Sequence, residues 1–324
     1  GTQRLNATHE AAAVLADPMG FDARRAPQHR DAAGDSEDAD ECVGHVLIVS
    51  QLFAVSFVAD VTSRGRLADN WHMPEILEVE MYAEAARRVI GRRVSRVTHL
   101  DSLVVGEPEI VRGLEGKRIT DVTRLGKVLT LHTSWMAVDL HFGMSGRIIV
   151  DGRSPIDELS YAASDDSRWI RFGLSFGKGF MFISDPRRFA RVQPSLNGEG
   201  LGPDAMTIGK QAFRERVSGR GAPIKAVLLD QSSVAGLGNM LVDEILWRAD
   251  VDPRRKNLDA ATVDLIHTRM RAVLPQLARR GGSHAGRLSV ELRVPGSACP
   301  RDGAILSRAT VGGRTTFWCP KHQR

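Results

Sequence analysis

Cysteine is scarce in this chain, which has three among 324 residues: Cys42, Cys299 and Cys319. Three cysteines do not make a disulfide framework, so a reducing, cytoplasmic setting fits the sequence best. A long uninterrupted apolar run is also missing. The most apolar stretch, 43–61, is broken by polar residues, and no basic segment precedes it as in a secretory signal. We therefore expect no membrane span, with a membrane-proximal anchor at 43–61 as the alternative.

Basic charge is scarce in the first part of the chain. Residues 1–72 hold 6 Lys or Arg and 11 Asp or Glu, which leaves 38 basic and 28 acidic residues, a net charge of +10, for positions 73–324. A basic body favours a polyanionic partner, most simply nucleic acid. Residues 1–41 lack sustained periodicity and are rich in Ala, Asp, Glu and Arg, which predicts disorder. We interpret 1–72 as a disordered or spuriously translated extension, with a genuine tail as the alternative.

From residue 73 onward the apolar pattern becomes regular. The spacing predicts a helix over 79–89, which Gly91 follows as a stop signal. Short strand-like segments come next, and the pattern is helical from about 203 to 280. A helix before many short strands predicts an α+β protein of several domains that begins with a β-sandwich carrying a leading helix. The predicted strands are 94–99, 118–124, 128–133, 136–141, 147–150, 169–176, 180–185 and 190–194.

The sharpest local signal lies in the helical part. Segments 223–231 and 240–249 are predicted to be helices, and the sequence Val-Ala-Gly-Leu-Gly-Asn at 234–239 is a glycine-rich turn between them. Glycines let a backbone approach a phosphate closely, and the amides at the start of a helix can hold an anion. Asn239 adds a side-chain donor and Lys225 a positive charge. An ordinary helical hairpin is the alternative.

Several short motifs appear in a fixed order along 73–324. They are MPE at 73–75, GK at 126–127, HFGMSG at 141–146, DPRRF at 185–189, IK at 224–225 and GRTTFWCP at 313–320. Together they resemble the formamidopyrimidine-DNA glycosylase / endonuclease VIII family of base-excision repair enzymes. The resemblance implies a catalytic β-sandwich domain over 73–200, a helix–two-turn–helix DNA-binding domain over 201–283 and a zinc-finger-like hairpin over 284–324.

The resemblance also implies a bifunctional DNA glycosylase and abasic-site lyase. In this family an N-terminal proline amine attacks the sugar C1′ of a flipped-out nucleotide, and the base leaves through an iminium intermediate before elimination at the 3′ and 5′ phosphates. Pro74 matches that nucleophile, Glu75 the carboxylate that handles protons at the ring oxygen, and Lys127 the lysine that assists catalysis. Within a chain the proline nitrogen is an inert tertiary amide. A catalytically silent DNA-binding protein of the same fold is therefore the alternative.

Further residues match the family's contacts with damaged double-stranded DNA, which the resemblance implies as the partner of a monomeric, bacterial, nucleoid-associated enzyme. Met144, Arg187 and Phe189 match the residues that fill the gap left by a flipped base. Arg188 and Arg314 match phosphate contacts. Core packing is the alternative for the two apolar residues. The short segment available for a lesion-capping loop, about 281–288, leaves the choice between oxidised purines and oxidised pyrimidines open.

The end of the chain departs from the family pattern. Cys299, Asp302, Cys319 and His322 keep the spacing at which the family has four cysteines around one tetrahedral Zn²⁺. Zinc accepts carboxylate oxygen and imidazole nitrogen, so a Cys₂-Asp-His zinc site is chemically possible, although carboxylates are uncommon in structural sites. A hairpin without zinc, stabilised by its aromatic residues and strands, is the alternative.

Overall fold

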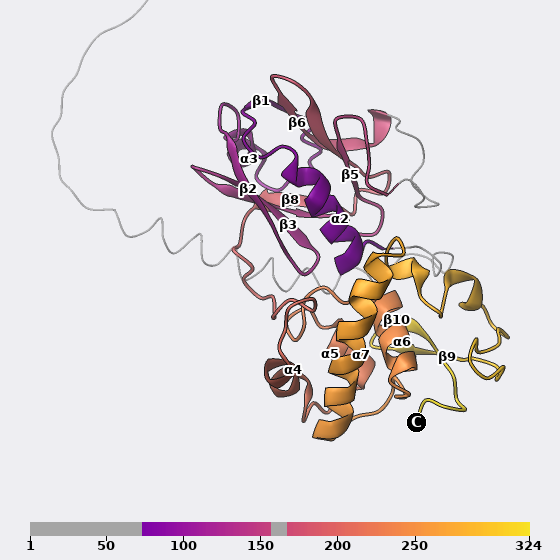
Figure 1. Cartoon of the computed structure of the whole chain (residues 1–324). Helices are drawn as coiled ribbons and strands as arrows, with labels where there is room; N and C mark the ends of the chain where they lie inside the picture. The colour runs from indigo at the N-terminus through magenta and orange to yellow at the C-terminus, as the bar shows by residue number, and fades with distance from the viewer. Residues whose placement is uncertain (1–72, 157–166) are drawn as a thin grey trace, which may run out of the picture. The chain divides into compact units, whose positions relative to one another are not determined.

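The computed structural model describes residues 73–156 and 167–324 (Figure 1). The predictions for 1–72, including the possible anchor at 43–61, lie outside these described residues. Among the helices of the described part, none combines the length and the apolar composition needed to cross a membrane.

The first described helix, α2, spans Ile76–Arg87 and so begins three residues before the predicted start at 79. The reason is a capping interaction: the side chain of Glu78 accepts a hydrogen bond of 2.9 Å from the backbone N–H of Glu75, the residue that precedes the helix. A Glu three positions into a helix commonly satisfies the amide of its N-cap in this way. The pair of glutamates was thus the signal for the true start.

Two four-stranded antiparallel sheets follow, and each predicted strand is present with ends within one residue of those expected. A short helix, α3 (Pro108–Arg112), was not predicted. Helix α2 contacts strands of both sheets, as expected for a sandwich with a leading helix. One sheet has the order β1 (Val94–Thr98), β6 (Ile170–Phe176), β7 (Phe180–Ser184), β5 (Arg147–Val150), and the other β2 (Ile119–Leu125), β3 (Val128–Thr133), β4 (Ala137–His141), β8 (Arg191–Pro194).

The apolar faces of both sheets enclose a single core with α2. Tyr82 of α2, Leu129 of β3 and Phe172 of β6 are each fully buried in it. Burial of a large apolar side chain contributes roughly 1.5–3 kcal/mol, so this shared core holds the sheets and the helix together.

The helical part contains α4 (Lys210–Val217), α5 (Ile224–Leu229), α6 (Asn239–Arg248) and α7 (Ala260–Ala278), and so confirms the expected helical region. Its core includes Ile76 and Leu77, the first residues of α2. The segment that carries Pro74 and Glu75 is therefore anchored on the helical part, while the rest of α2 packs on the sheets. After two short turns of 3₁₀ helix, β9 (Ser307–Val311) and β10 (Arg314–Trp318) form the predicted hairpin.

Candidate active site and metal centre

The carboxylate of Glu75 lies at the N-terminal end of α6. Its oxygens accept hydrogen bonds from the backbone N–H groups of Gly238 (2.9 Å), Met240 (2.8 Å) and Leu241 (3.2 Å). Residue 238 must be small here, because a Cβ on Gly238 would lie 2.3 Å from Cδ of Glu75. We expected these amides to be free for a phosphate. The structure corrects that expectation, since the anion that they hold is the protein's own carboxylate.

Burial raises the pKa of Glu75, and the neighbouring charge of Lys127 and the α6 amides only partly oppose the rise. The side chain is 1 % exposed, so water stabilises its charged form very little. A carboxyl group in this state keeps a proton to higher pH than usual. It can therefore donate a proton at higher pH than an ordinary carboxyl group, and the sequence alone did not reveal this shift.

Lys127 lies in the tight turn between β2 and β3, where Gly126 has a φ of +58°. A Cβ on Gly126 would lie 2.8 Å from the Cβ of Ala235, so this turn packs closely on the glycine-rich turn of the helical part. Burial lowers the pKa of Lys127, the charge of Glu75 opposes the change and that of Arg314 adds to it. Three residues that lie far apart in the sequence thus share one electrostatic site.

His141 also belongs to this site, although sequence reasoning gave it no role. Its Nδ1 accepts a hydrogen bond of 3.1 Å from the backbone N–H of Gly143. Burial lowers the pKa of His141 to about 4, and the charges of Lys127 and Arg191 add to the effect. The ring is therefore neutral at pH 7, with its proton on Nε2. Its place as the first residue of the HFGMSG motif was the available signal.

A buried carboxylate organises the loop that holds the predicted gap-filling residues. Asp185 is 0 % exposed and accepts hydrogen bonds from the hydroxyl of Ser145 (2.5 Å) and the backbone N–H groups of Arg187 (3.0 Å) and Ala190 (2.7 Å). It therefore fixes the DPRRF loop against the HFGMSG loop. The residues that the sequence proposed for filling a vacated base position come from these two loops.

The side chains of these two loops differ in their exposure to solvent. Phe189 is 40 % exposed and its ring centroid lies 4.6 Å from the guanidinium carbon of Arg187, so core packing does not explain it. Met144 is half-buried. Arg188 is exposed, has a φ of 57° and donates to Asp101 over 2.7 Å. Their contacts with DNA stay predictions.

Lys225 is not exposed in the way that a lysine ready to bind phosphate would be. Its ammonium is fully buried, 2.7 Å from Oδ1 of Asp243, while Arg293 lies 2.5 Å from Oδ2 of the same carboxylate. Asp243 and Arg293 were missed in the sequence because nothing near them forms a motif. A contact between Lys225 and a phosphate stays a prediction, and it requires the ammonium to leave Asp243.

The start of α6 is also tied to the hairpin. The amide nitrogen of Asn239 donates to the carbonyl oxygen of Thr315 over 3.1 Å, and the Lys225 ammonium lies 3.4 Å from the same oxygen. Thr315 follows Arg314, whose charge acts on Lys127. The helical part therefore positions the hairpin arginine beside the Glu75 site.

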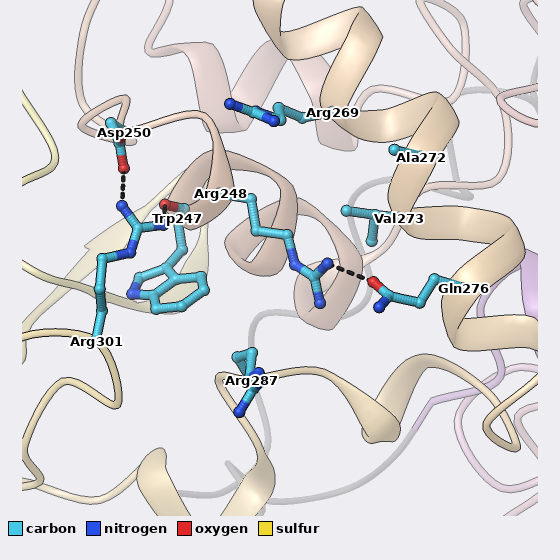
Figure 2. Close-up of a pocket in the computed structure, with 9 residues that line it drawn as sticks. All are labelled: Trp247, Arg248, Asp250, Arg269, Ala272, Val273, Gln276, Arg287 and Arg301. Atoms are coloured by element: carbon cyan, nitrogen blue, oxygen red, sulfur yellow. Dashed lines mark hydrogen bonds and ion pairs between the residues drawn. The ribbon is translucent and has the colours of Figure 1, made fainter.

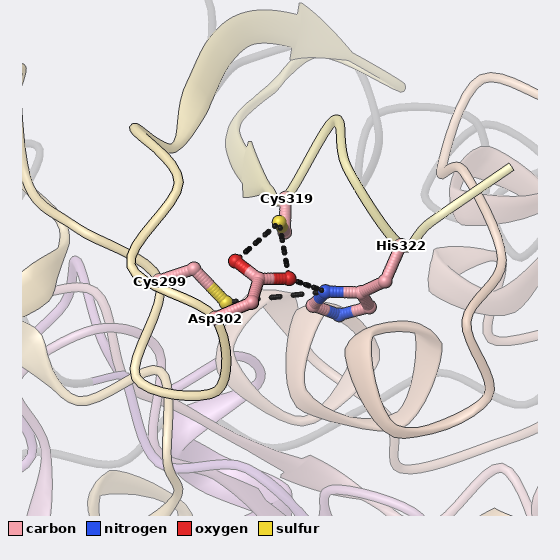
Figure 3. A group of neighbouring side chains, drawn as sticks. All are labelled: Cys299, Asp302, Cys319 and His322. Atoms are coloured by element: carbon pink, nitrogen blue, oxygen red, sulfur yellow. Dashed lines mark hydrogen bonds and ion pairs between the residues drawn. The ribbon is translucent and has the colours of Figure 1, made fainter.

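The four predicted metal ligands converge, as Figure 3 shows, with one donor atom from each lying within 4.8 Å of the others. Nδ1 of His322 is 2.7 Å from Asp302, and Sγ of Cys319 is 3.4 Å from the same carboxylate. The hydrogen bond with His322 lowers the pKa of Asp302, whereas burial raises the pKa of Cys319. Two buried sulfurs, an anionic oxygen and an imidazole nitrogen fit a tetrahedral zinc ion.

Comparisons with known proteins cover the same region of the chain. A family model described as the formamidopyrimidine-DNA glycosylase N-terminal domain matches residues 73–192, and one described as the formamidopyrimidine-DNA glycosylase H2TH domain matches 200–287. The formamidopyrimidine-DNA glycosylase of Stenotrophomonas maltophilia (strain K279a) is 32% identical over 282 residues, which are 78% of this chain and 100% of that protein. That of Chloroflexus aggregans is 33% identical over 281 residues, which are 76% and 98%.

Solved structures show the same similarity. A complex between Lactococcus lactis Fpg and DNA containing an abasic site has a TM-score of 0.66 and 25% identity, covering 78% of this chain and 100% of that one. A structure of MutM in complex with DNA containing carbocyclic 8-oxo-G has a TM-score of 0.65 at the same identity and coverage.

Proposed function

Because the chain belongs to the formamidopyrimidine-DNA glycosylase family, we propose that it excises oxidised bases from double-stranded DNA and then cleaves the abasic strand. The observation that carries this proposal is the buried carboxyl group of Glu75. It follows Pro74 directly, is held by the amides of α6, and has a raised pKa beside Lys127. Such a group is suited to proton transfer at a sugar.

In the proposed reaction the amine of Pro74 attacks C1′ of the damaged nucleotide, and the bond from C1′ to the base breaks. Glu75 donates a proton to the ring oxygen as the sugar opens to an iminium. Loss of a proton from C2′ then expels the 3′ phosphate, and a second elimination expels the 5′ phosphate. Lys127 stabilises the phosphate charge beside the reacting sugar.

The DNA contacts in this proposal come from the loops around the site. Met144, Arg187 and Phe189 occupy the space that the flipped nucleotide leaves, and their partly open placement allows this. Arg188, Asn239, Lys225 and Arg314 contact phosphates, with Arg188 and Lys225 first leaving their carboxylate partners. The enzyme acts as a monomer.

A zinc ion is part of the proposal as a structural group. Cys299, Asp302, Cys319 and His322 would hold it and so join the two ends of the hairpin segment. Bound zinc contributes folding free energy to such small elements. Here it would keep Arg314 in place.

The proposed chemistry requires a free amine on Pro74, and therefore a working protein that begins at this residue. N-terminal sequencing of the natural protein, followed by borohydride reduction on DNA containing an abasic site, tests this. We expect a covalent complex with protein that begins at Pro74 and none with chain that retains Met73, because a tertiary amide cannot form an iminium. If the Pro74-initiated protein binds the abasic DNA but is not trapped, the catalytically silent DNA-binding alternative replaces the enzyme.

A further inference from the structure

A basic pocket of about 360 Å³ lies at the C-terminal end of α6, beside the middle of α7 (Figure 2). Four arginines line it, Arg248, Arg269, Arg287 and Arg301, and Asp250 is the one carboxylate in its lining. The pocket is about 13 Å along α6 from Asn239, given a rise of roughly 1.5 Å per residue. It is therefore separate from the Glu75 site at the other end of that helix.

Two of the arginines are fixed by neighbours. Arg248 lies 2.7 Å from Glu244 and donates to the side-chain oxygen of Gln276 over 2.5 Å. Arg301 pairs with Asp250 and lies over the ring of Trp247, with 4.4 Å between its guanidinium carbon and the ring centroid. Their orientations are thus set before any ligand binds, which lowers the entropy cost of binding.

The other two guanidinium groups, those of Arg269 and Arg287, have no hydrogen-bond or ion-pair partner within the described part of the chain. The backbone that carries Arg287 is nevertheless fixed. The N–H of Leu288 donates to Glu244 over 2.9 Å, and a Cβ on Gly286 would lie 2.8 Å from the same carboxylate. Arg287 is consequently held at the rim of the pocket with its charge unpaired.

The side chains that line and support this pocket leave it with a net positive charge. Glu244 and Asp250 neutralise Arg248 and Arg301, and two positive charges remain on Arg269 and Arg287. Guanidinium groups match phosphate oxygens in geometry and bind them through paired hydrogen bonds. A volume of about 360 Å³ is near the lower end of small-ligand sites, roughly 300–1,000 Å³. We propose that this pocket binds a compact polyphosphate, an anion with at least two adjacent phosphate groups.

Isothermal titration of the full chain with sodium tripolyphosphate, at physiological salt, tests the proposal. We expect saturable binding with one ligand per chain. The double variant R269A/R287A should raise the dissociation constant at least about tenfold, since loss of 1.4 kcal/mol is a factor of ten. Both side chains are exposed, so the variant should fold, which its thermal melt will check.

Matched variants locate the binding. R271A/R280A removes two exposed arginines outside the pocket lining and the same net charge, and it should keep the wild-type dissociation constant. R314A should keep it as well. Equal weakening in both double variants, a comparable loss in R314A, or no saturable heat would each overturn the proposal.

The last part of the test measures how tightly the variants bind undamaged duplex DNA. If the polyphosphate site is separate, R269A/R287A should bind a short duplex as tightly as R271A/R280A does. If the pocket double variant instead loses duplex affinity in the same proportion as tripolyphosphate affinity, the arginines belong to the DNA interface and the proposal is wrong.

Discussion

Two carboxylates of this molecule, Glu75 and Asp302, each attract several donors but reach opposite states. Glu75 accepts three backbone hydrogen bonds and lies near Lys127, yet burial raises its pKa. Asp302 is less buried, and its hydrogen bonds with His322 and the backbone N–H of Ala304 lower its pKa. Burial outweighs the donors in the first case and does not in the second.

The difference separates two kinds of chemistry. A carboxyl group that retains a proton can exchange it with a substrate, as proposed for Glu75. A carboxylate that stays ionised suits a cation, as proposed for Asp302 beside Cys319 and His322. The four experiments below test these two sites, the buried charge network that joins α6 to the hairpin and the electrostatics around Lys127, beginning with the largest expected effect.

Glu75→Gln tests the proton-transfer site. In Pro74-initiated protein it should lower the rate of base excision by about 10²–10⁴, the usual contribution of general acid–base catalysis, while DNA affinity changes little. Because the pKa of Glu75 is raised, wild-type activity should decline only at a higher pH than activity that depends on an ordinary carboxyl group. The variant has no carboxyl group to lose its proton, so its pH profile should not show this decline. Single-turnover excision across pH measures both effects. Glu78→Gln, at a second buried glutamate with a raised pKa, is the control and should mainly lower stability.

Asp243→Asn tests the buried charge network that joins α6 to the hairpin. Lys225 and Arg293 would lose their shared counter-ion in a buried setting, and breaking such a pair costs about 3–5 kcal/mol. Urea unfolding measures the change. Asp264→Asn removes the half-buried partner of the exposed Arg214 and should leave the unfolding midpoint nearly unchanged. A similar loss in both variants would mean that the network does not stabilise the fold.

Cys299→Ala tests the metal centre. With zinc at 100 times its dissociation constant, bound metal stabilises the native state by about 2.7 kcal/mol. The variant should therefore be destabilised by roughly this much more in zinc than in chelator, as measured by thermal melts in both buffers. Equal destabilisation in both would favour the hairpin without zinc. Mass spectrometry of the native protein gives the zinc content directly.

His141→Asn tests the electrostatics around Lys127. The pKa of His141 falls from 6.5 to about 4 on folding, so its contribution to stability is fully present above pH 6.5 and is lost as the pH falls towards 4. Between pH 6.5 and 5 the wild type should lose about 1.6 kcal/mol of stability that the variant does not lose. Urea unfolding at several pH values measures this. If the slope in His141→Asn is identical to that of the wild type, His141 does not have this role.

The strands and helices were largely predictable because their apolar periodicity is local. The ends of all eight strands followed to within one residue from alternation and turn residues, and the four candidate metal ligands from the resemblance to the family's cysteine spacing. The start of α2 was misplaced because its signal was a pair of glutamates rather than apolar spacing. The partners of Lys225 were unpredictable, since Asp243 and Arg293 lie 18 and 68 positions away without a motif.

The sequence by itself determined which residues are proposed to carry the chemistry: the MPE motif, Lys127, the glycine-rich turn and the four hairpin residues that would bind zinc. Only the tertiary structure decided what state those residues adopt. The amides at the start of α6 hold Glu75 rather than a phosphate because folding places that carboxylate among them. A pKa or a free guanidinium depends on burial and on neighbours from distant segments, and a linear pattern contains neither.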